Sequence, residues 1–546
     1  MGIFLQRLSD LNAEVNSCAW GYGIYLLLGA GIIMTVATKA FQFMHIRHWF
    51  KKTIGSIFRK DVCKNTQNKS ISQFQALCTS LAATIGVGNI AGVAAAVAGG
   101  GPGAVFWMWI AAFLGMMTNY SENVLGIYYR RKNADGEWAG GAMYYLENGI
   151  GSLRHCRHLG KFLAVIFSVF CILASFGIGN MGQVNKIVSN FTTAFGNEAL
   201  SSIVLYGENE SAITMYHLIL GIIIAAVGGV IILGGLKRIA VFAEKVVPFM
   251  VIVFLLGSFT VILANAGHIL PAFSAIFESA FSAKAVWGGT NGLAVKQIIT
   301  IGCKRGMFSN EAGLGSTVMV NSSSNVKEPV IQGMWGIFEV FTDTVVVCTM
   351  TALVILTSGV IDLDTGMLLC GAADDSTLVA KAFETVFGGF GEKFVAIAIF
   401  LFAFTTLLGW SHYGAMAIEY LFGKNSVKTY KMAFVIMTAS GALMTSSIAW
   451  DISDTFNALM MLPNLIGITG LSGTVVKITK NYTDRIFKGI KIKPLLSSSA
   501  EIQRKHEREL IEKKAVELEK QENNSQKRRQ NGYYYTNGKT KSITRT

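Results

Sequence analysis

Charged residues are scarce in this sequence. Of its 546 residues, only 15% are Asp, Glu, Lys or Arg, whereas an average soluble protein carries roughly 25%. A chain with so few charges lacks the polar surface that would cover a folded core of this size in water. A soluble enzyme and an intrinsically disordered protein are therefore excluded.

Cysteine pairs and the residue pattern of a secretory signal peptide are not found in the sequence. The 8 cysteines are scattered singly, without a C-x-x-C pair, so neither a metal site nor a disulfide framework is indicated. We interpret most of them as small apolar residues at helix interfaces. The first residues do not join a basic segment directly to an apolar run and a cleavage site, and we therefore expect no signal peptide.

Long apolar runs are abundant. Hydrophobic residues make up 52% of the chain, and the mean hydropathy is +0.46. Runs such as residues 213–233 and 246–264 match a hydrocarbon core about 30 Å thick, and they do not alternate apolar with polar residues as the strands of a transmembrane barrel do. The sequence predicts an all-α polytopic membrane protein with about 11 transmembrane helices. We place them roughly at residues 17–44, 72–98, 103–129, 160–183, 213–234, 240–265, 272–303, 332–358, 390–422, 431–449 and 455–478.

Basic residues gather in alternate loops between these spans. The net charge of +14 is better explained by the positive-inside rule than by binding to nucleic acid. The rule places the N-terminus outside and the C-terminus in the cytoplasm. Beyond about residue 497 the chain becomes polar and of mixed charge, which indicates a solvated cytoplasmic tail, with a regulatory docking segment as the alternative. The basic loops are residues 45–60, 130–132, 237–238 and 304–305; the neutral or acidic ones include residues 207–211 and 371–376.

Two of the spans are interrupted by glycine. The second span contains Gly86-Val87-Gly88-Asn89, and the seventh contains Gly288-Gly289-Thr290-Asn291-Gly292. Each glycine inside a helix costs about 1 kcal/mol relative to alanine, and unwound backbone at membrane depth is tolerated only where it lines a cavity or is buried in protein. Close helix packing through small residues is the alternative explanation.

The spacing of the two interrupted spans favours a transporter. They lie five spans apart, so spans 2–6 and 7–11 form two groups of five, and an odd number of spans forces the second group to lie inverted. Interrupted helices at matching positions of inverted halves are typical of the binding site of a secondary transporter.

Several motifs resemble those of a known family. They are residues 83–93 (ATIGVGNIAGV), 100–109 (GGPGAVFWMW), 304–316 (KRGMFSNEAGLGS) and 402–410 (FAFTTLLGW). Over about residues 15–480 the chain resembles the bacterial and archaeal alanine/glycine:cation symporters, also called sodium:alanine symporters, which have a leucine-transporter-like fold. The resemblance implies one extra N-terminal helix before a 5+5 inverted repeat with two broken helices, in a prokaryotic inner or plasma membrane. The expected parts are residues 1–71 (extra helix and basic loop), 72–270 (first repeat), 271–480 (second repeat) and 481–546 (charged tail).

An amino-acid substrate needs donors for its carboxylate and acceptors for its ammonium group. The amides of Val87 and Gly88 begin the second half of a broken helix, where unpaired N–H groups favour an anion. Carbonyls freed on the other side of each break would accept from the ammonium group. The candidate substrate-binding residues are Thr84, Val87, Gly88, Asn89, Phe176, Asn180, Trp287, Gly288, Gly289 and Trp410. Asn180 shares a helix face with Gln183, and the indole of Trp410 would wall a small pocket.

The expected sodium ligands follow from the resemblance. They are the carbonyls of Ala82 and Ile85 and the hydroxyls of Thr405 and Thr406. From the residues alone, the two threonines could equally bond to carbonyls of their own helix.

Ionisable residues within the spans are functional hypotheses by default. For Glu122, Glu339 and Asp343 we expect helix capping or pairing with loop Lys and Arg, with proton coupling as the less favoured alternative. Arg305 and Glu311 are placed in a cytoplasmic loop, where they could contact a gate.

The sequence thus predicts a secondary active transporter that couples inward sodium movement to uptake of alanine, glycine or serine. The alternative is a proton-coupled amino-acid transporter of the same fold. A channel is disfavoured because no repeated pore loop or charged ring occurs, and an enzyme because the sequence has neither H-E-x-x-H nor G-x-S-x-G. The expected partners are a small neutral amino acid, sodium as a co-transported ion and the lipid bilayer, without a cofactor or nucleic acid, and we expect a monomer.

Overall fold

The computed structural model describes residues 2–63, 70–207, 212–281, 295–363, 366–370, 375–444 and 446–512. The chain divides into two compact units, Met1–Lys480 and Asn481–Thr546. The described part of the second unit includes a helical stretch over residues 500–512. In this unit, Oε1 of Gln503 accepts hydrogen bonds from the backbone N–H groups of Leu496 and Ser497.

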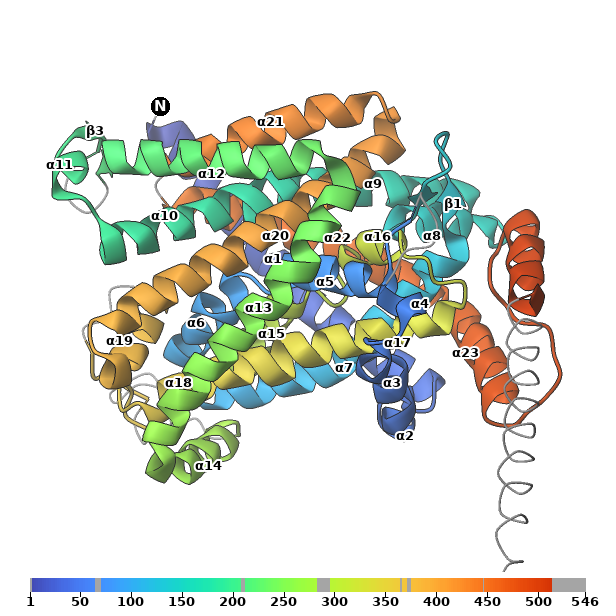
Figure 1. The fold of residues 1–546 in the computed structure, drawn as a ribbon, viewed down its shortest axis with the longest axis horizontal. Helices are drawn as coiled ribbons and strands as arrows, with labels where there is room; N and C mark the ends of the chain where they lie inside the picture. The colour runs from blue at the N-terminus through green and yellow to red at the C-terminus, as the bar shows by residue number, and fades with distance from the viewer. Residues whose placement is uncertain are drawn as a thin grey trace, which may run out of the picture. The chain divides into compact units, whose positions relative to one another are not determined.

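The first unit is built almost entirely of helices (Figure 1). Its first part contains α1 (Gly2–Ala37), α2 (Phe41–Met44), α3 (Ile46–Lys52), η1 (Ile54–Ser56), α4 (Lys60–Cys63), α5 (Gln73–Thr84), η2 (Val87–Asn89), α6 (Ala91–Gly100), α7 (Gly103–Tyr129), α8 (Ala142–Asn148), η3 (Ile150–Ser152), α9 (Arg157–Phe176), η4 (Gly177–Met181), α10 (Gly182–Phe195), α11 (Glu198–Ser201), α12 (Met215–Leu233) and α13 (Gly235–Ala264). The second part contains η6 (Ala266–His268), α14 (Ile269–Ser279), α15 (Val295–Asn310), α16 (Thr317–Asn321), α17 (Pro329–Val340), η8 (Phe341–Cys348), α18 (Thr349–Thr357), α19 (Asp375–Phe387), α20 (Phe390–Phe422), α21 (Ser426–Gly441) and α22 (Ser446–Gly470). The first unit ends within α23 (Ser472–Ile486), whose last residues belong to the second unit.

Two short antiparallel hairpins interrupt the helices. Strands β1 (Arg131–Lys132) and β2 (Trp138–Ala139) pair with each other, as do β3 (Val204–Tyr206) and β4 (Ile213–Thr214). The elements η4 and η8 are π-helical turns inside longer helices, and such turns are frequent at functional sites.

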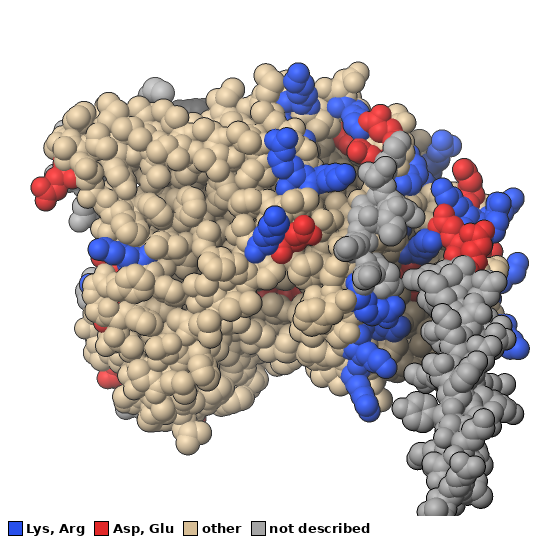
Figure 2. Space-filling model, in the orientation of Figure 1, with Lys and Arg blue, Asp and Glu red and all other residues tan. Residues whose placement is uncertain are grey.

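The predicted membrane character is confirmed. Six helical segments are long and apolar enough to cross a bilayer, and two bent pairs raise the number to as many as eight among the described residues. Large apolar side chains such as Val230 and Leu256 are more than 60% exposed on α12 and α13, as contact with lipid requires. Most of the face in view in Figure 2 is neutral, and the Lys and Arg side chains of the first unit gather mainly toward the end that carries β1 and α8. The count of 11 spans and the inverted relation of the two groups stay predictions.

The first predicted break is confirmed. Helix α5 ends at Thr84, and the chain continues through η2 into α6 at an angle of 65°. The side chain of Asn89 stabilises the break, because its Oδ1 accepts from the backbone N–H of Gly86 at 2.9 Å. At the other end of α5, Ser72 and Gln75 form a capping box, which fixes where the helix begins.

The expectation that Lys304 and Arg305 lie in a loop is wrong. Lys304 and Arg305 lie within α15, and residues 311–316 form a buried, non-helical break between α15 and α16. Glu311, Gly313 and Gly315 have positive φ angles of 54°, 90° and 75°, which end the helix because continued helix needs negative φ. The predicted break at residues 288–292 lies outside the described residues.

Close packing through glycine holds the first break against α20. A Cβ added at Gly409 would lie 2.5 Å from the Cβ of Ala83 and 2.9 Å from its Cα. Helix α20 also packs against α9, α10, α19 and α21, so it has little freedom to move away from α5.

We expect Gly409→Ala to lower the free energy of unfolding by about 1–3 kcal/mol, the usual cost of overpacking. The matched control is Gly29→Ala in α1, where an added Cβ meets no atom within 4 Å. Thermal melting of both variants in detergent measures the difference, and equal melting temperatures would contradict this view of the contact.

Candidate functional site

A small cavity lies at the first break. Its volume is about 20 Å³, which is room for little more than one water-sized species. The break itself, η4 with α10, α15 with the turn after it, α20 and α22 all contribute to its wall. The lining residues are Ala83, Thr84, Gly86, Gly88, Ile178, Gln183, Phe308, Glu311, Thr406, Trp410 and Asn457.

Three oxygen atoms meet at the wall formed by α5 and α20. The hydroxyl of Thr406 donates to the carbonyl of Ala82 at 3.2 Å and lies 3.5 Å from the carbonyl of Ile85. A Cβ at Gly86 would lie 2.5 Å from this hydroxyl oxygen, so only glycine leaves it in place. The structure therefore brings together three of the four candidate sodium ligands, and hard oxygen atoms from an unwound helix are what transporters use to hold such an ion.

Thr405, the fourth candidate ligand, points elsewhere. Its hydroxyl donates to the carbonyl of Phe402 at 3.0 Å and lies 3.6 Å from the sulfur of Met250. Adjacent residues on a helix project about 100° apart because one turn takes 3.6 residues, and in this structure only Thr406 faces the break.

Two polar atoms of the cavity wall have no hydrogen-bond partner among the described residues. They are Oγ1 of Thr84 and Oδ1 of Asn457, and both side chains are at least 96% buried. A third polar side chain, Gln183, reaches the break, where its Oε1 lies 3.5 Å from the amide nitrogen of Val87. Unpaired buried polar atoms are costly, so these groups favour a polar ligand in the cavity.

A buried carboxyl group and an indole ring close another side of the cavity. Oε1 of Glu311 accepts from the indole N–H of Trp410 at 2.9 Å, and Oε2 accepts from the hydroxyl of Ser316 at 2.5 Å. The ring of Trp410 packs so tightly on the π-helical turn that a Cβ at Gly179 would lie 2.3 Å from it. Sequence reasoning missed Glu311 and Phe308 as site residues, although the motif that contains them is highly specific.

Several predicted substrate contacts serve helix packing instead. Asn180 donates to the carbonyl of Phe434 at 2.8 Å and accepts from Thr438 at 2.9 Å, and the ring of Phe176 packs against Tyr430 and Phe434. Both residues thus contact α21, and neither lines the cavity. Trp287, Gly288 and Gly289 lie outside the described residues.

Asn89 belongs to a polar cluster beside the cavity. Its Nδ2 donates to Oδ1 of Asp343 at 2.8 Å, while Ser309 and Thr344 donate to Oδ2 at 2.8 and 2.9 Å. This cluster ties the first break to α15 and to η8. The side-chain amide of Asn89 is occupied by these contacts and by Gly86. It therefore stabilises the break, and it does not line the cavity.

The expected pairing of buried carboxyl groups with loop Lys or Arg is wrong within the described part of the chain. Besides the contacts of Asp343, Glu339 accepts from Ser80 at 2.5 Å and from Asn321 at 3.3 Å. Glu122 accepts from Asn464 at 2.6 Å and from the backbone N–H of Gly315 at 3.1 Å. These carboxyl groups are fully buried, and the partners named here are all neutral groups.

Known proteins are similar to this chain over most of its length. The model of the sodium:alanine symporter family matches residues 5–494. The sodium/alanine symporter AgcS of Methanococcus maripaludis is 41% identical over 471 residues, which cover 86% of this chain and 96% of that protein. The amino-acid carrier protein AlsT of Bacillus subtilis is 32% identical over 473 residues, 86% of this chain and 91% of that protein. Among solved structures, MhsT in complex with L-phenylalanine aligns with a TM-score of 0.48 and 11% identity, over 76% of this chain and 99% of that one.

Proposed function

This chain belongs to the sodium:alanine symporter family and is therefore a membrane transporter rather than an enzyme, and we propose that it couples inward sodium movement to the uptake of a small neutral amino acid. Sodium acts here as a co-transported ion and not as a resident cofactor. Alternating access of the cavity at the first break to the two sides of the membrane would carry both solutes.

The geometry at Thr406 carries the sodium part of this proposal. Its hydroxyl and the carbonyls of Ala82 and Ile85 offer three hard oxygen atoms at one point. They come from a broken helix and a continuous one, so movement of either helix alters the site. An ion bound there would hold α5 against α20 and thereby link its own binding to the conformation of the transporter.

The polar wall of the cavity suits an amino acid. The carboxyl group of Glu311 is an acceptor for an ammonium group, and the hydroxyl of Thr84 can donate to a carboxylate or accept from an ammonium group. The amides of Val87 and Gly88 lie at the start of a helical segment, where N–H groups favour a carboxylate, which would take the place of Oε1 of Gln183 at the amide of Val87. A zwitterion would therefore find partners for both of its charges.

The small cavity, of about 20 Å³, disfavours large side chains, because its walls would have to move apart even for alanine, glycine or serine. Trp410 is pinned by Glu311 and by its packing on Gly179, so the wall has no room to retreat on that side. The name of AgcS, a sodium/alanine symporter that is 41% identical to this chain over 471 residues, supports alanine.

Proton coupling is the second candidate. Buried carboxyl groups without a cationic partner, such as Glu122, Glu339 and Asp343, are typical of proton relays in transporters. In the described residues each of them accepts from neutral donors only, so a proton could be gained or lost without breaking an ion pair.

The orientation in the membrane follows from charge. We propose that the end with the β1–β2 hairpin faces the cytoplasm, because short cytoplasmic loops are enriched in Lys and Arg. The N-terminus would then lie outside a prokaryotic inner or plasma membrane and the C-terminal tail inside.

Uptake into proteoliposomes tests the function. We expect labelled alanine to accumulate under an inward sodium gradient at fixed pH and to stop accumulating when choline replaces sodium. Accumulation that ignores sodium and follows an imposed pH gradient would reject sodium coupling in favour of the proton.

A further inference from the structure

A second, larger cavity lies beside the β1–β2 hairpin. We call it the hairpin pocket. Its volume is about 360 Å³, within the usual range of small-molecule sites of roughly 300–1,000 Å³. Its walls are the hairpin, the turn between α12 and α13, the last turns of α20 and the first turns of α21.

The hairpin pocket lies farther along α20 than the central cavity. Thr406 and Trp410 line the central cavity, whereas His412, Met416 and Glu419 line the hairpin pocket. His412 is six residues beyond Thr406, which is about 9 Å along a helix axis. The pocket therefore lies between the central cavity and the basic end of the protein, where a transported solute would leave if that end faces the cytoplasm.

A buried ring nitrogen lacks a partner in this pocket. His412 is only 8% exposed, and its Nε2 has no hydrogen-bond partner among the described residues. A buried polar atom without a hydrogen bond lowers the stability of the fold, so this nitrogen favours a ligand that forms a hydrogen bond with it.

Two charged side chains of the pocket, Lys431 and Glu419, also have polar atoms without a described contact. Lys431 takes part in no hydrogen bond or ion pair within the described part of the chain, and its Nζ is held 3.5 Å from where a Cβ of Gly235 would lie. Glu419 uses one carboxylate oxygen to accept from Asn133 at 3.0 Å, and no described contact involves its other oxygen.

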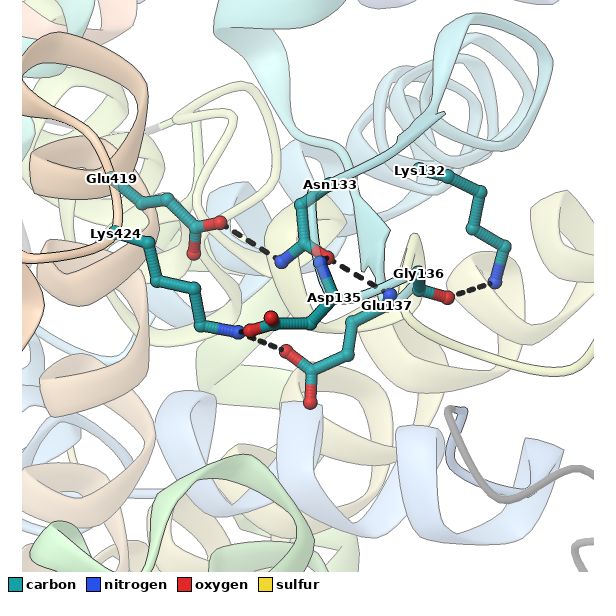
Figure 3. A network of polar contacts seen from close by, with 7 residues as sticks. All are labelled: Lys132, Asn133, Asp135, Gly136, Glu137, Glu419 and Lys424. Carbon is teal, nitrogen blue, oxygen red and sulfur yellow. Dashed lines mark hydrogen bonds and ion pairs between the residues drawn. The ribbon is translucent and has the colours of Figure 1, made fainter.

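The hairpin completes the wall with its own charges already satisfied. Figure 3 shows Lys424 reaching to Asp135 and Glu137 of the hairpin, while Glu419 reaches to Asn133. Lys424 is occupied by two carboxylates and Lys237 is exposed, so the half-buried ammonium group left for a ligand is that of Lys431. A carboxylate oxygen is left on Glu419, and a second one on Glu137.

One ammonium group, one carboxylate oxygen and one imidazole nitrogen complement a zwitterion. We propose that the hairpin pocket is a second binding site for neutral α-amino acids, which accepts side chains larger than those the central cavity admits. Lys431 binds the ligand carboxylate, Glu419 binds the ammonium group, and His412 bonds to either end. The role of this second site rests on the proposed function. A bulky amino acid from the cytoplasm would occupy the exit and slow the release of the transported amino acid, without being carried itself.

Equilibrium binding of labelled leucine to the purified full-length protein in detergent tests the site. We expect about one leucine per chain, with choline in place of sodium. Lys431→Gln and His412→Leu should each weaken leucine binding by at least about tenfold, the usual loss for a hydrogen bond to a charged or buried group. Lys431→Arg keeps the charge and should keep most of the affinity.

The matched control is Lys428→Gln, which removes an exposed lysine from the same helix that does not line the pocket. It should bind leucine like the unmodified protein. Leucine that fails to bind, or that binds equally well to the Lys428 and Lys431 variants when both have unmodified melting temperatures, would overturn the proposal.

A transport measurement separates this inference from the proposed function. Leucine trapped inside proteoliposomes should slow alanine uptake by the unmodified protein and the Lys428→Gln variant, and much less by Lys431→Gln. If alanine uptake proves independent of sodium, the proposed function fails. Leucine binding in choline still supports or rejects the hairpin pocket, because that measurement involves neither sodium nor transport.

Discussion

Replacing Thr406 with valine is expected to raise the sodium concentration for half-maximal alanine uptake by about 10- to 100-fold. Valine has nearly the shape of threonine but lacks the hydroxyl, which lies between the carbonyls of Ala82 and Ile85. Hydrogen bonds to charged groups contribute about 1.5–3 kcal/mol, and we expect loss of one ion ligand to cost a similar amount. The measurement is uptake in proteoliposomes across a series of sodium concentrations at constant ionic strength.

Thr405→Val is the matched control for this experiment. The Thr405 hydroxyl donates within its own helix and contacts Met250, so its loss should leave the sodium dependence within about twofold. Equal sodium dependence in the two variants would remove Thr406 from the ion site. A strong effect in both would mean that the helix rotates during transport and presents each hydroxyl in turn.

Glu311→Gln is expected to raise the KM for alanine by at least tenfold while leaving sodium affinity nearly unchanged. Glutamine has the same shape, and its amide oxygen can still accept from the indole of Trp410 or the hydroxyl of Ser316. The variant therefore changes the charge available to a substrate ammonium group more than the packing. Charged hydrogen bonds exceed neutral ones by about 1 kcal/mol or more, and low local polarity strengthens the difference.

Trp410→Phe separates substrate binding from the positioning of the indole. It removes the N–H donor that contacts Glu311 but keeps the carboxyl group and most of the ring. We expect a smaller increase in KM than in Glu311→Gln. A larger increase in Trp410→Phe would assign Glu311 the lesser role of holding the tryptophan.

The sequence predicts the first break well because its signal is local. Gly86 and Gly88 interrupt an apolar run, and no partner from elsewhere is needed to recognise them. The buried break at residues 311–316 is not predicted, because Ser309, Asn310 and Glu311 form a polar stretch that resembles a loop. Hydropathy cannot distinguish a polar stretch in water from one buried against Trp410, which lies about a hundred residues farther along the chain.

The contacts of Asn180 differ from those we expected, for a geometric reason. Residues three apart share a face only on a regular α-helix, and Asn180 lies in the π-helical turn η4. A π turn inserts an extra residue and rotates the helical residues after it. Gln183 therefore reaches the break at Val87, whereas Asn180 contacts Phe434. The amino-acid pattern alone carries no clear mark of such a turn.

The ion pairs that join the β1–β2 hairpin to Lys424 are exposed to solvent. This exposure limits how strongly the hairpin can act as a latch that closes the hairpin pocket. The side chains of Lys424, Asp135 and Glu137 are 42%, 56% and 55% exposed, and such pairs contribute at most about 1 kcal/mol each. Thermal motion can open a latch of that strength many times in one transport cycle. Raised salt screens it further, so the rate of exit should depend on ionic strength even when the sodium gradient is held constant.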